Sequence, residues 1–352
     1  MIRRPPRSTQ GVSSAASDVY KRQVMVHAAA TWNPSNALET SLLAYLVAGL
    51  GGLAAPLFVT IFGWGMYKSK SPRKSILTKA AILLILQYVV NLCSPHLYEP
   101  YSPGILSLFA MLLIAKPVIM KSIESIKNML ILNGLIVGMF VINSFFIEFQ
   151  GSSNWDSRIV VNDFLQLINL TLFTGTYPVF PWITFCVFGA FLGRSVMEVD
   201  KTLPINNTTV TMIVVGISYC LVTLYLAIRN SEVWAHPSKG DYLNFFPANF
   251  GFMIAAITGV LILWLIVQEL NILLFEQAGK VSLTVYVVHF IPLTYLSNLE
   301  NERNWTIMEA SQAVVLFTTT WLIFAYFCNR YQLSLIHISE PTRPRLISYA
   351  VF

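Results

Sequence analysis

Charged residues are scarce in this chain. Only 11% of its 352 residues are charged and 55% are apolar, whereas about 25% are charged in an ordinary soluble domain. The apolar residues fall in runs of roughly 18 or more, separated by short polar segments, which is the pattern of repeated membrane-spanning helices. This composition argues against one large soluble core, and no water-soluble domain is evident between the runs.

Cysteine is also rare, and its spacing carries no metal or redox signature. The four cysteines lie in or at the ends of different apolar runs, without a CxxC motif or a paired Cys/His spacing: Cys93, Cys186, Cys220 and Cys328. Such cysteines are typical of small apolar packing residues. The sequence therefore predicts neither a disulfide framework nor a metal site.

Several motifs that carry well-understood chemistry are missing. The sequence has no Walker loop and no GxGxxG, HExxH or GxSxG motif, and it lacks a chain of intramembrane carboxylates such as proton-coupled pumps use. It also shows neither an internal repeat nor a matched pair of interrupted helices, both of which mark many transporters. These absences weaken a transporter interpretation without excluding it.

The two ends of the chain resemble translated sequencing adapters. Residues 18–23, DVYKRQ, can be encoded by GAT GTG TAT AAG AGA CAG, and the reverse complement of that DNA encodes LSLIHI, which is residues 333–338. Inverted, flanking copies of one short DNA are what ligated or transposed adapters leave behind, whereas a disordered basic head and tail would match only by chance. We therefore expect residues 1–23 and 333–352 to be artefacts and residues 24–332 to form one transmembrane domain.

The adapter-like ends account for most of the net charge of +6. They hold seven basic and two acidic residues, so residues 24–332 carry an excess of only one positive charge. A nucleic-acid partner is therefore not expected. If the ends are foreign, the first helix begins before Val24, and we expect the chain as given to be inactive because part of that helix is lost.

Hydropathy predicts an all-α, polytopic membrane bundle of about ten transmembrane helices, the first of them truncated. Each complete run is close to the ~20 residues that a helix needs to cross the hydrocarbon. Glycine and proline in the second run permit close helix packing and a bend. The expected spans are residues 24–31, 42–67, 76–93, 103–119, 129–148, 177–194, 209–228, 248–269, 281–299 and 310–329.

Lysine and arginine are concentrated in alternate connections, which predicts the orientation of the bundle. The connections expected on the cytoplasmic side carry Lys68, Lys70, Arg73, Lys74, Lys116, Lys121, Lys127, Arg194, Lys201, Lys280 and Arg330. The opposite connections are richer in acidic residues and should lie outside. The longest of these, Gln150 to Thr176, contains the amphipathic stretch Val160 to Phe173, which is expected to form an interfacial or re-entrant helix.

Two histidines lie at membrane depth. His27 is near the outer end of the first span, and His289 is about midway along residues 281–299. Ionisable groups there are costly and usually face a cavity, and histidine is the most common general base near neutral pH. The alternatives are structural: a helix-end ring bonded to a backbone carbonyl for His27, and a buried, satisfied ring for His289.

Three basic residues at the inner face are candidates for binding an anionic donor. Arg73 and Lys74, in KSKSPRK, and Arg194, which closes GAFLGR, lie where the phosphates of a cytoplasmic donor such as coenzyme A would arrive. The planar fork of arginine suits phosphate. For any one of these residues, ordinary positive-inside topology is the simpler explanation.

The order of several segments points to one family. The segments are VMVHAAATW, then AAPLFVTIFGWGMY before a basic loop, YSPGILSLFAMLLIAKP, GTYPVFPWITFCVFGAFLGR and GKVSLTVYVVHF. Together they cover most of residues 24–332, and they resemble the transmembrane acyltransferase superfamily. Within it the chain looks most like bacterial relatives of heparan-alpha-glucosaminide N-acetyltransferase and acyltransferase-3-like membrane proteins.

That resemblance implies an activity and a site. It implies an enzyme of the prokaryotic cytoplasmic (inner) membrane that moves an acyl group, usually acetyl, from cytoplasmic acyl-CoA to a hydroxyl or amine of an extracytoplasmic glycan. His27 matches the family's essential histidine, which either activates the acceptor or is itself acylated, and the basic residues at the inner face match donor-binding positions. Trp32, Tyr286, Trp182 and His289 are the residues we place around the acceptor or its cavity. The family's arginine motif at the start of the first helix would fall in the adapter-like part.

The competing hypothesis is a non-enzymatic polytopic protein, such as a transporter of a glycan, a lipid or a small molecule. Its histidines would be structural or would line a pathway. In either case membrane lipid and a glycan or small-molecule ligand are the expected partners, and acyl-CoA is the expected donor only in the first. The sequence leaves the oligomeric state open, a dimer included.

Overall fold

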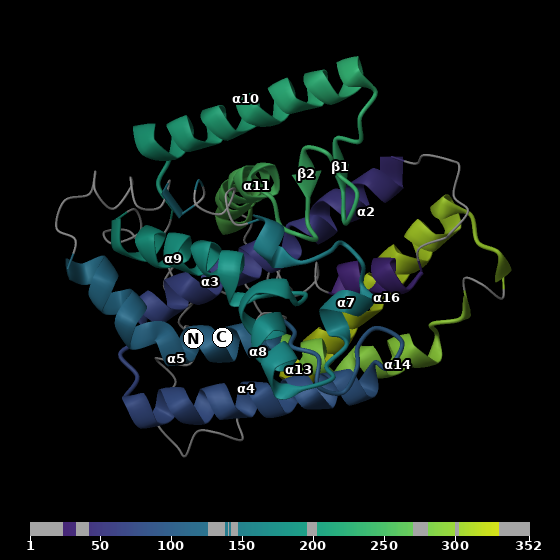
Figure 1. Cartoon of the computed structure of the whole chain (residues 1–352). Coiled ribbons are helices and arrows are strands. Elements are labelled where there is room, and N and C mark those ends of the chain that lie inside the picture. The colour runs from purple at the N-terminus through teal and green to yellow at the C-terminus, as the bar shows by residue number, and fades with distance from the viewer. Residues whose placement is uncertain are drawn as a thin grey trace, which may run out of the picture.

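The computed structural model describes residues 24–32, 42–125, 138–139, 141, 147–195, 203–269, 281–299 and 303–330. It is 76% helical, and in the described part of the chain the only strands are a short parallel pair, β1 and β2 (Figure 1). Residues 24–31 form the first helix. The further elements are α2 (Leu42–Gly52), α3 (Ala54–Lys68), α4 (Arg73–Cys93), α5 (Ile105–Ser125), η1 (Ile147–Gln150), α7 (Asp156–Ile159), α8 (Phe164–Asn169), η2 (Leu170–Thr174), α9 (Val179–Ser195), α10 (Asn207–Asn230), β1 (Ala235–His236), β2 (Leu243–Asn244), α11 (Phe250–Glu269), α13 (Ser282–Val288), α14 (Phe290–Tyr295) and α16 (Ile307–Arg330).

The helices are those of a multi-pass membrane protein. Six of the described helical segments are long and apolar enough to cross a membrane, and a seventh span results if the bent pair Phe164–Thr174 and Val179–Arg194 counts as one. The expected span 129–148 lies almost wholly outside the described residues. The expected span 281–299 forms two short helices, α13 and α14, which meet at His289. The total of ten spans therefore goes beyond what these helices establish.

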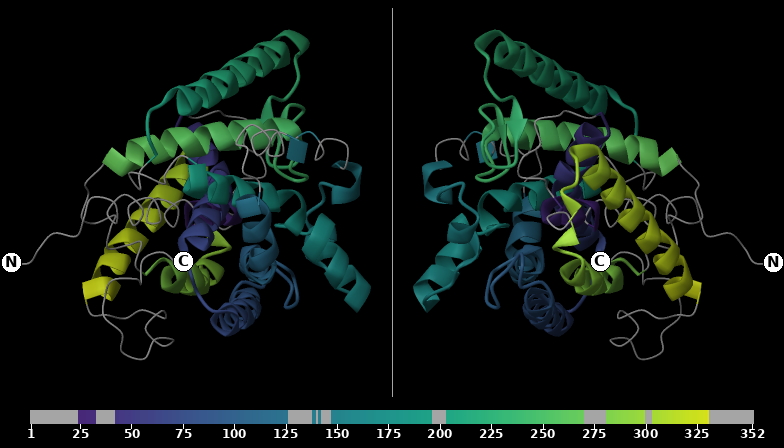
Figure 2. Two further views of the ribbon diagram at one scale, coloured as in Figure 1. Left: turned by 90° about the vertical axis from the view of Figure 1, so that its left-hand side faces the viewer. Right: turned by 90° about the vertical axis from the view of Figure 1, so that its right-hand side faces the viewer.

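Helix α10 presents an apolar surface that suits lipid. It packs against α11 and stands apart from the rest of the bundle (Figures 1 and 2). Large apolar side chains along it are exposed, among them Val215, Leu221 and Ile228. A soluble protein rarely exposes so long an apolar stripe, so the surface supports the membrane assignment made from composition.

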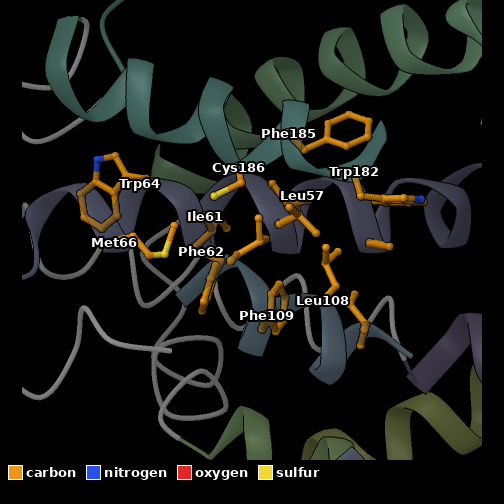
Figure 3. Close-up of a cluster of buried hydrophobic side chains, with 14 of the residues drawn as sticks. Leu57, Ile61, Phe62, Trp64, Met66, Leu108, Phe109, Trp182, Phe185 and Cys186 are labelled. Carbon is orange, nitrogen blue, oxygen red and sulfur yellow. The ribbon is translucent and has the colours of Figure 1, made fainter. Parts of the chain in front are cut away.

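The main core lies between α3, α5 and α9. Figure 3 shows Leu57, Ile61 and Phe62 of α3 between Phe109 of α5 and the side chains of α9. The Phe62 and Phe109 rings stack with their centroids 4.3 Å apart. Aromatic pairs in this range add to the energy of burial, which fixes these three helices as the frame of the bundle.

Helices α3 and α9 make the most extensive contact because glycine lets their backbones meet. A Cβ at Gly63 would overlap the carbonyl oxygen of Cys186, and a Cβ at Gly189 would overlap the carbonyl oxygen of Thr60. Small residues at such crossings are the usual device for close packing in membranes. The close helix packing that glycine in residues 42–67 permits is thus found at Gly63.

We expect Gly63→Ala to destabilise the bundle, although alanine normally favours a helix over glycine. The atoms nearest to the new Cβ are backbone atoms of Cys186, which cannot move aside as a flexible side chain could. The two helices must therefore separate. An overpacking cost of ~3 kcal/mol corresponds to a fall in melting temperature of about 6–12 °C. Gly49→Ala is the matched control, because nothing lies within 4 Å of a Cβ there. Thermal unfolding in detergent should lower the midpoint of the first variant alone, and equal midpoints would contradict this account.

Two predicted element boundaries differ from the structure. Helix α5 continues to Ser125, past the expected end at residue 119 and through Pro117. Hydropathy placed the end too early because Lys116 and Lys121 are polar, yet Lys116 is buried and donates to the Ser69 carbonyl. The predicted amphipathic helix Val160–Phe173 begins later, at Phe164, where Asp163 caps the Gln166 amide. With η2 it forms a segment bent by 45° against α9, which is the geometry of either a broken span or a re-entrant loop.

The connections expected on the outer side interlock with one another. Trp155 donates to the Leu97 carbonyl at 2.9 Å, Ser102 donates to the Ile159 carbonyl at 2.6 Å, and Thr176 donates to the Pro103 carbonyl at 3.0 Å. These bonds fasten the segment 147–177 to the loop between α4 and α5. We call these two bonded connections, residues 94–104 and 147–177, the outer cap.

Arg158 holds this outer cap from within. Only 2% of its surface is exposed, and its terminal nitrogens donate to the carbonyls of Gln150, Thr174 and Gly175 at 3.0–3.2 Å. Burial lowers the pKa of Arg158 to about 10, so it stays charged at neutral pH. Its guanidinium also lies over the Phe246 ring, which makes it a structural clamp rather than an exposed basic residue.

Candidate functional site

The structure brings His27 and His289 together, although 262 residues separate them in sequence. His27 Nδ1 and His289 Nε2 are 2.9 Å apart, and the two rings stack with centroids 5.1 Å apart. The exposed fractions of the side chains are 6% for His27 and 0% for His289. Two imidazoles in direct contact at this depth form the strongest candidate for chemistry in the described part of the chain.

The partners of the two rings fix where their protons lie. His289 Nδ1 faces the Val285 carbonyl oxygen at 3.0 Å, and a carbonyl can only accept, so this nitrogen carries the hydrogen. Burial disfavours a charged ring, so Nε2 of the neutral His289 is an acceptor. His27 must then donate from Nδ1, and its own Nε2 keeps a free lone pair.

His27 Nε2 makes no hydrogen bond with any residue in the described ranges, so its lone pair is left for a reactant. A base oriented by a second group through its far nitrogen, with the near nitrogen unbonded, is the arrangement that general-base catalysis requires.

Local sequence explains why His289 sits at a break. Pro292 cannot donate to the carbonyl four residues earlier and its ring crowds that turn, which separates α13 from α14 at His289. Spacings of three and four residues place side chains on one helix face, so Tyr286, His289 and Phe290 surround the same space. Their rings all lie within 6 Å of the His27 ring, with centroid distances of 5.7, 5.1 and 4.6 Å.

The first helix is inserted between two parts of the bundle. Val24 packs against Val285 and Trp321, and Ala28 packs with Leu293 and Val314. Trp32 donates from Nε1 to the Leu296 carbonyl at 2.8 Å and packs edge-on against Phe317. Trp32 therefore anchors the end of the first helix to the segment after α14, and positions His27 without touching it.

A third histidine joins the outer ends of three segments. His96 is exposed, and its Nε2 lies 3.2 Å from Thr31 Oγ1 while its Nδ1 lies 3.1 Å from Thr294 Oγ1. Thr294 also donates to the Cys93 carbonyl at 2.6 Å. Partial burial lowers the pKa of His96, which favours its neutral form at neutral pH. Sequence reasoning assigned no role to His96, because this contact joins three distant parts of the chain.

The basic residues at the inner face are not part of the histidine cluster. Arg73 and Lys74 begin α4, whereas His96 and its threonine partners lie beyond the end of that helix. A helix of 21 residues is about 30 Å long, so most of a membrane separates the two ends. Arg194 contributes its guanidinium to the Ile123 carbonyl at the end of α5, which is a bond between helices.

Trp182 lies in the main core and not beside His27. Its ring contacts Tyr177, Phe185, Phe245 and Phe252 with centroids 5.1–6.3 Å apart, and Figure 3 shows it on α9 next to Phe185. Of the residues placed around the acceptor from sequence, Tyr286 and His289 contact His27, whereas Trp32 and Trp182 do not. Phe290 is the residue that sequence reasoning missed, although it follows His289 directly.

Comparison with known proteins adds no assignment. No protein-family model matches the chain, and no curated protein matches it. The described residues also contain no group of three or more His, Cys, Asp or Glu side chains that could hold a metal ion. The functional argument therefore depends on the geometry of the histidine pair and its surroundings.

Proposed function

We propose that this protein is a membrane-embedded acyltransferase of about ten transmembrane helices in a prokaryotic cytoplasmic membrane. It would move an acyl group, in the first place acetyl, from cytoplasmic acyl-CoA to a hydroxyl or amine of an extracytoplasmic glycan. The observation that carries the proposal is the buried contact between His27 and His289, in which the bond from His27 Nδ1 to His289 orients the lone pair on His27 Nε2.

The chemistry follows from that lone pair. His27 Nε2 accepts the proton of the acceptor hydroxyl or amine as the oxygen or nitrogen attacks the thioester carbonyl carbon. The bond between carbon and sulfur then breaks, and the proton passes from His27 to the leaving thiolate of coenzyme A. Throughout, His289 keeps the His27 ring in one orientation and accepts from its Nδ1.

We assign the basic residues at the inner face to binding the phosphates of the acyl-CoA donor. Arg73 and Lys74 are exposed at the start of α4, where a negatively charged nucleotide would also meet the positive end of the helix dipole. From there the acyl arm must extend along most of α4 to reach His27. Arg194 would act by holding the ends of α5 and α9 together beside that entrance.

The proposal is tested by acetyl transfer in membranes. The protein should be expressed from its source gene, so that the codons before Val24 and after residue 332 are the native ones. Membranes carrying it should release free coenzyme A from acetyl-CoA only when a glycan acceptor is present, and should transfer the labelled acetyl group to that acceptor. Uptake of the glycan into vesicles without any loss of acetyl-CoA would favour the transporter hypothesis and contradict the enzyme.

A further inference from the structure

His96 links the first helix to α14 through two threonine hydroxyls. Its Nε2 lies 3.2 Å from Thr31 Oγ1, and its Nδ1 lies 3.1 Å from Thr294 Oγ1. Thr31 ends the first helix, Thr294 is on α14, and His96 belongs to the outer cap. One imidazole therefore bridges two helices that are far apart in the sequence. We call Thr31, His96 and Thr294 the histidine bridge.

The histidine bridge lies about one helical turn from the contact between His27 and His289. Thr31 follows His27 by four residues, which is a rise of ~6 Å, and Thr294 follows His289 by five residues, which is a rise of ~7.5 Å. The same two segments are therefore joined at two points, by the histidine pair and, one turn further along both, by the bridge. Two joins a turn apart resist sliding and rotation of one helix against the other, which a single join cannot do.

Trp32 does not duplicate the histidine bridge. It bonds the Leu296 carbonyl, just beyond the end of α14. Residues four apart share a helix face, so Thr31 lies on the face that carries His27, whereas Trp32, the next residue along, points about 100° away from that of Thr31. A single bond at the tip of the first helix is a pivot about which the rest of the helix can turn.

Donors and acceptors in the bridge match a neutral imidazole. Thr294 donates its one hydroxyl hydrogen to the Cys93 carbonyl at 2.6 Å, so its oxygen must accept from His96 Nδ1. Partial burial lowers the pKa of His96, and a neutral ring with its hydrogen on Nδ1 leaves Nε2 to accept from Thr31. The bridge is thus satisfied in one direction, from Thr31 through His96 to Thr294 and the end of α4.

The turn that carries His96 is itself fixed to α4. Ser94 is buried and donates from Oγ to the Val90 carbonyl at 2.7 Å, while the amides of Leu97 and Tyr98 donate to the Ser94 carbonyl. Helix α4 in turn packs against α13 and α14 (Figure 1). His96 is held in place by this turn although its own side chain is exposed, so its removal opens no cavity in the core.

We propose that His96 is a positioning residue, which through Thr31 and Thr294 holds the first helix in the register and rotation that bring His27 Nδ1 to His289 Nε2. The assignment rests on the proposed acyl transfer for its effect on the rate, but the geometry that it predicts is measurable without any reaction. Because Thr31 and His27 lie on one face of the first helix, rotation about the helix axis moves both together. Loss of the bridge lets the His27 ring turn away from His289.

The geometry is tested first, without an acyl donor. The protein is expressed from its source gene with isotope-labelled histidine nitrogens and placed in lipid nanodiscs, and solid-state NMR follows the coupling across the hydrogen bond between His27 Nδ1 and His289 Nε2. We expect this coupling to be lost in His96→Ala and in the Thr31→Val, Thr294→Val double variant, which keeps the side-chain shapes without the hydroxyls. His96→Gln should restore it, because its amide can donate to Thr294 and accept from Thr31. An unchanged coupling in His96→Ala, or no coupling in the unaltered protein, would overturn the assignment.

Thr319→Val is the matched control for the threonine variants. Thr319 is exposed on α16 and donates to the Val315 carbonyl of its own helix, so this variant removes a similar hydroxyl far from the bridge. It should leave the coupling between the two histidines and the acetyl transfer unchanged. A loss of coupling in Thr319→Val equal to that in the double variant would contradict a specific role for the bridge.

Kinetics separate this positioning role from the transferase proposal. In active membranes His96→Ala should lower kcat by about 10–10²-fold, as a displaced catalytic group does, leave KM for acetyl-CoA unchanged, and His96→Gln should recover much of the rate. Normal kcat in His96→Ala would overturn the positioning role and leave acyl transfer standing. Coupling that depends on His96 in a protein that never consumes acetyl-CoA would support the positioning role and contradict the transferase.

Discussion

His27→Ala should lower acceptor-dependent acetyl transfer by about 10²–10⁴-fold, which is the contribution expected of a positioned general base. The loss should appear in kcat, because His27 takes the proton of the acceptor in the transition state. His27 is not expected to bind the phosphates of the donor. Acetyl-CoA consumption by membranes, measured with saturating acceptor, is the readout. Normal activity in this variant would remove His27 from the mechanism.

Two companions to His27→Ala show whether the fold or the chemistry is lost. His27→Gln keeps most of the side-chain volume between Tyr286 and Phe290 but offers no basic nitrogen, so it should be folded and almost inactive. His236→Gln is the matched control: His236 is exposed on β1 and accepts bonds from the amides of Ser238 and Lys239. It should keep full activity, and an equal loss in His236→Gln and His27→Gln would point to a general effect of losing a histidine.

Much of the helical frame follows from hydropathy, because each apolar run must satisfy its backbone bonds within the membrane. Residues 42–67, 76–93, 209–228 and 248–269 were all expected, and each coincides with an observed helix to within a few residues. The ends were less predictable where a charged side chain is buried. Lys116 belongs to the interior of α5 because it reaches the Ser69 carbonyl, a contact that no local pattern shows.

The residues of the candidate site could be predicted from the sequence, but the contacts between them could not. Depth in the membrane singled out His27 and His289 separately, and each had a structural alternative. Their bond depends on the first helix entering between α13 and α16, which is a tertiary feature. The same limit applies to the histidine bridge, since three separate segments carry it. Arg73 and Lys74 remain candidates by topology alone, because the structure leaves them at the far end of α4.

His289 should act as a positioning residue, and its replacement should lower kcat and leave KM nearly unchanged. In His289→Leu the His27 ring loses the acceptor for Nδ1 and can rotate or carry its proton on Nε2, where it cannot serve as a base. Activity should fall on the order of 10²-fold or more, in keeping with the loss seen when an orienting partner of a catalytic histidine is replaced. KM for both substrates should change little, since the His289 side chain is completely buried and its Nε2 is bonded to His27.

The glutamine variant separates this positioning role from simple packing. The amide oxygen of His289→Gln can occupy the place of Nε2 and accept from His27 Nδ1, so this variant should recover much of the lost rate. A purely structural His289 would reduce the rate of both variants alike, without recovery in the glutamine variant.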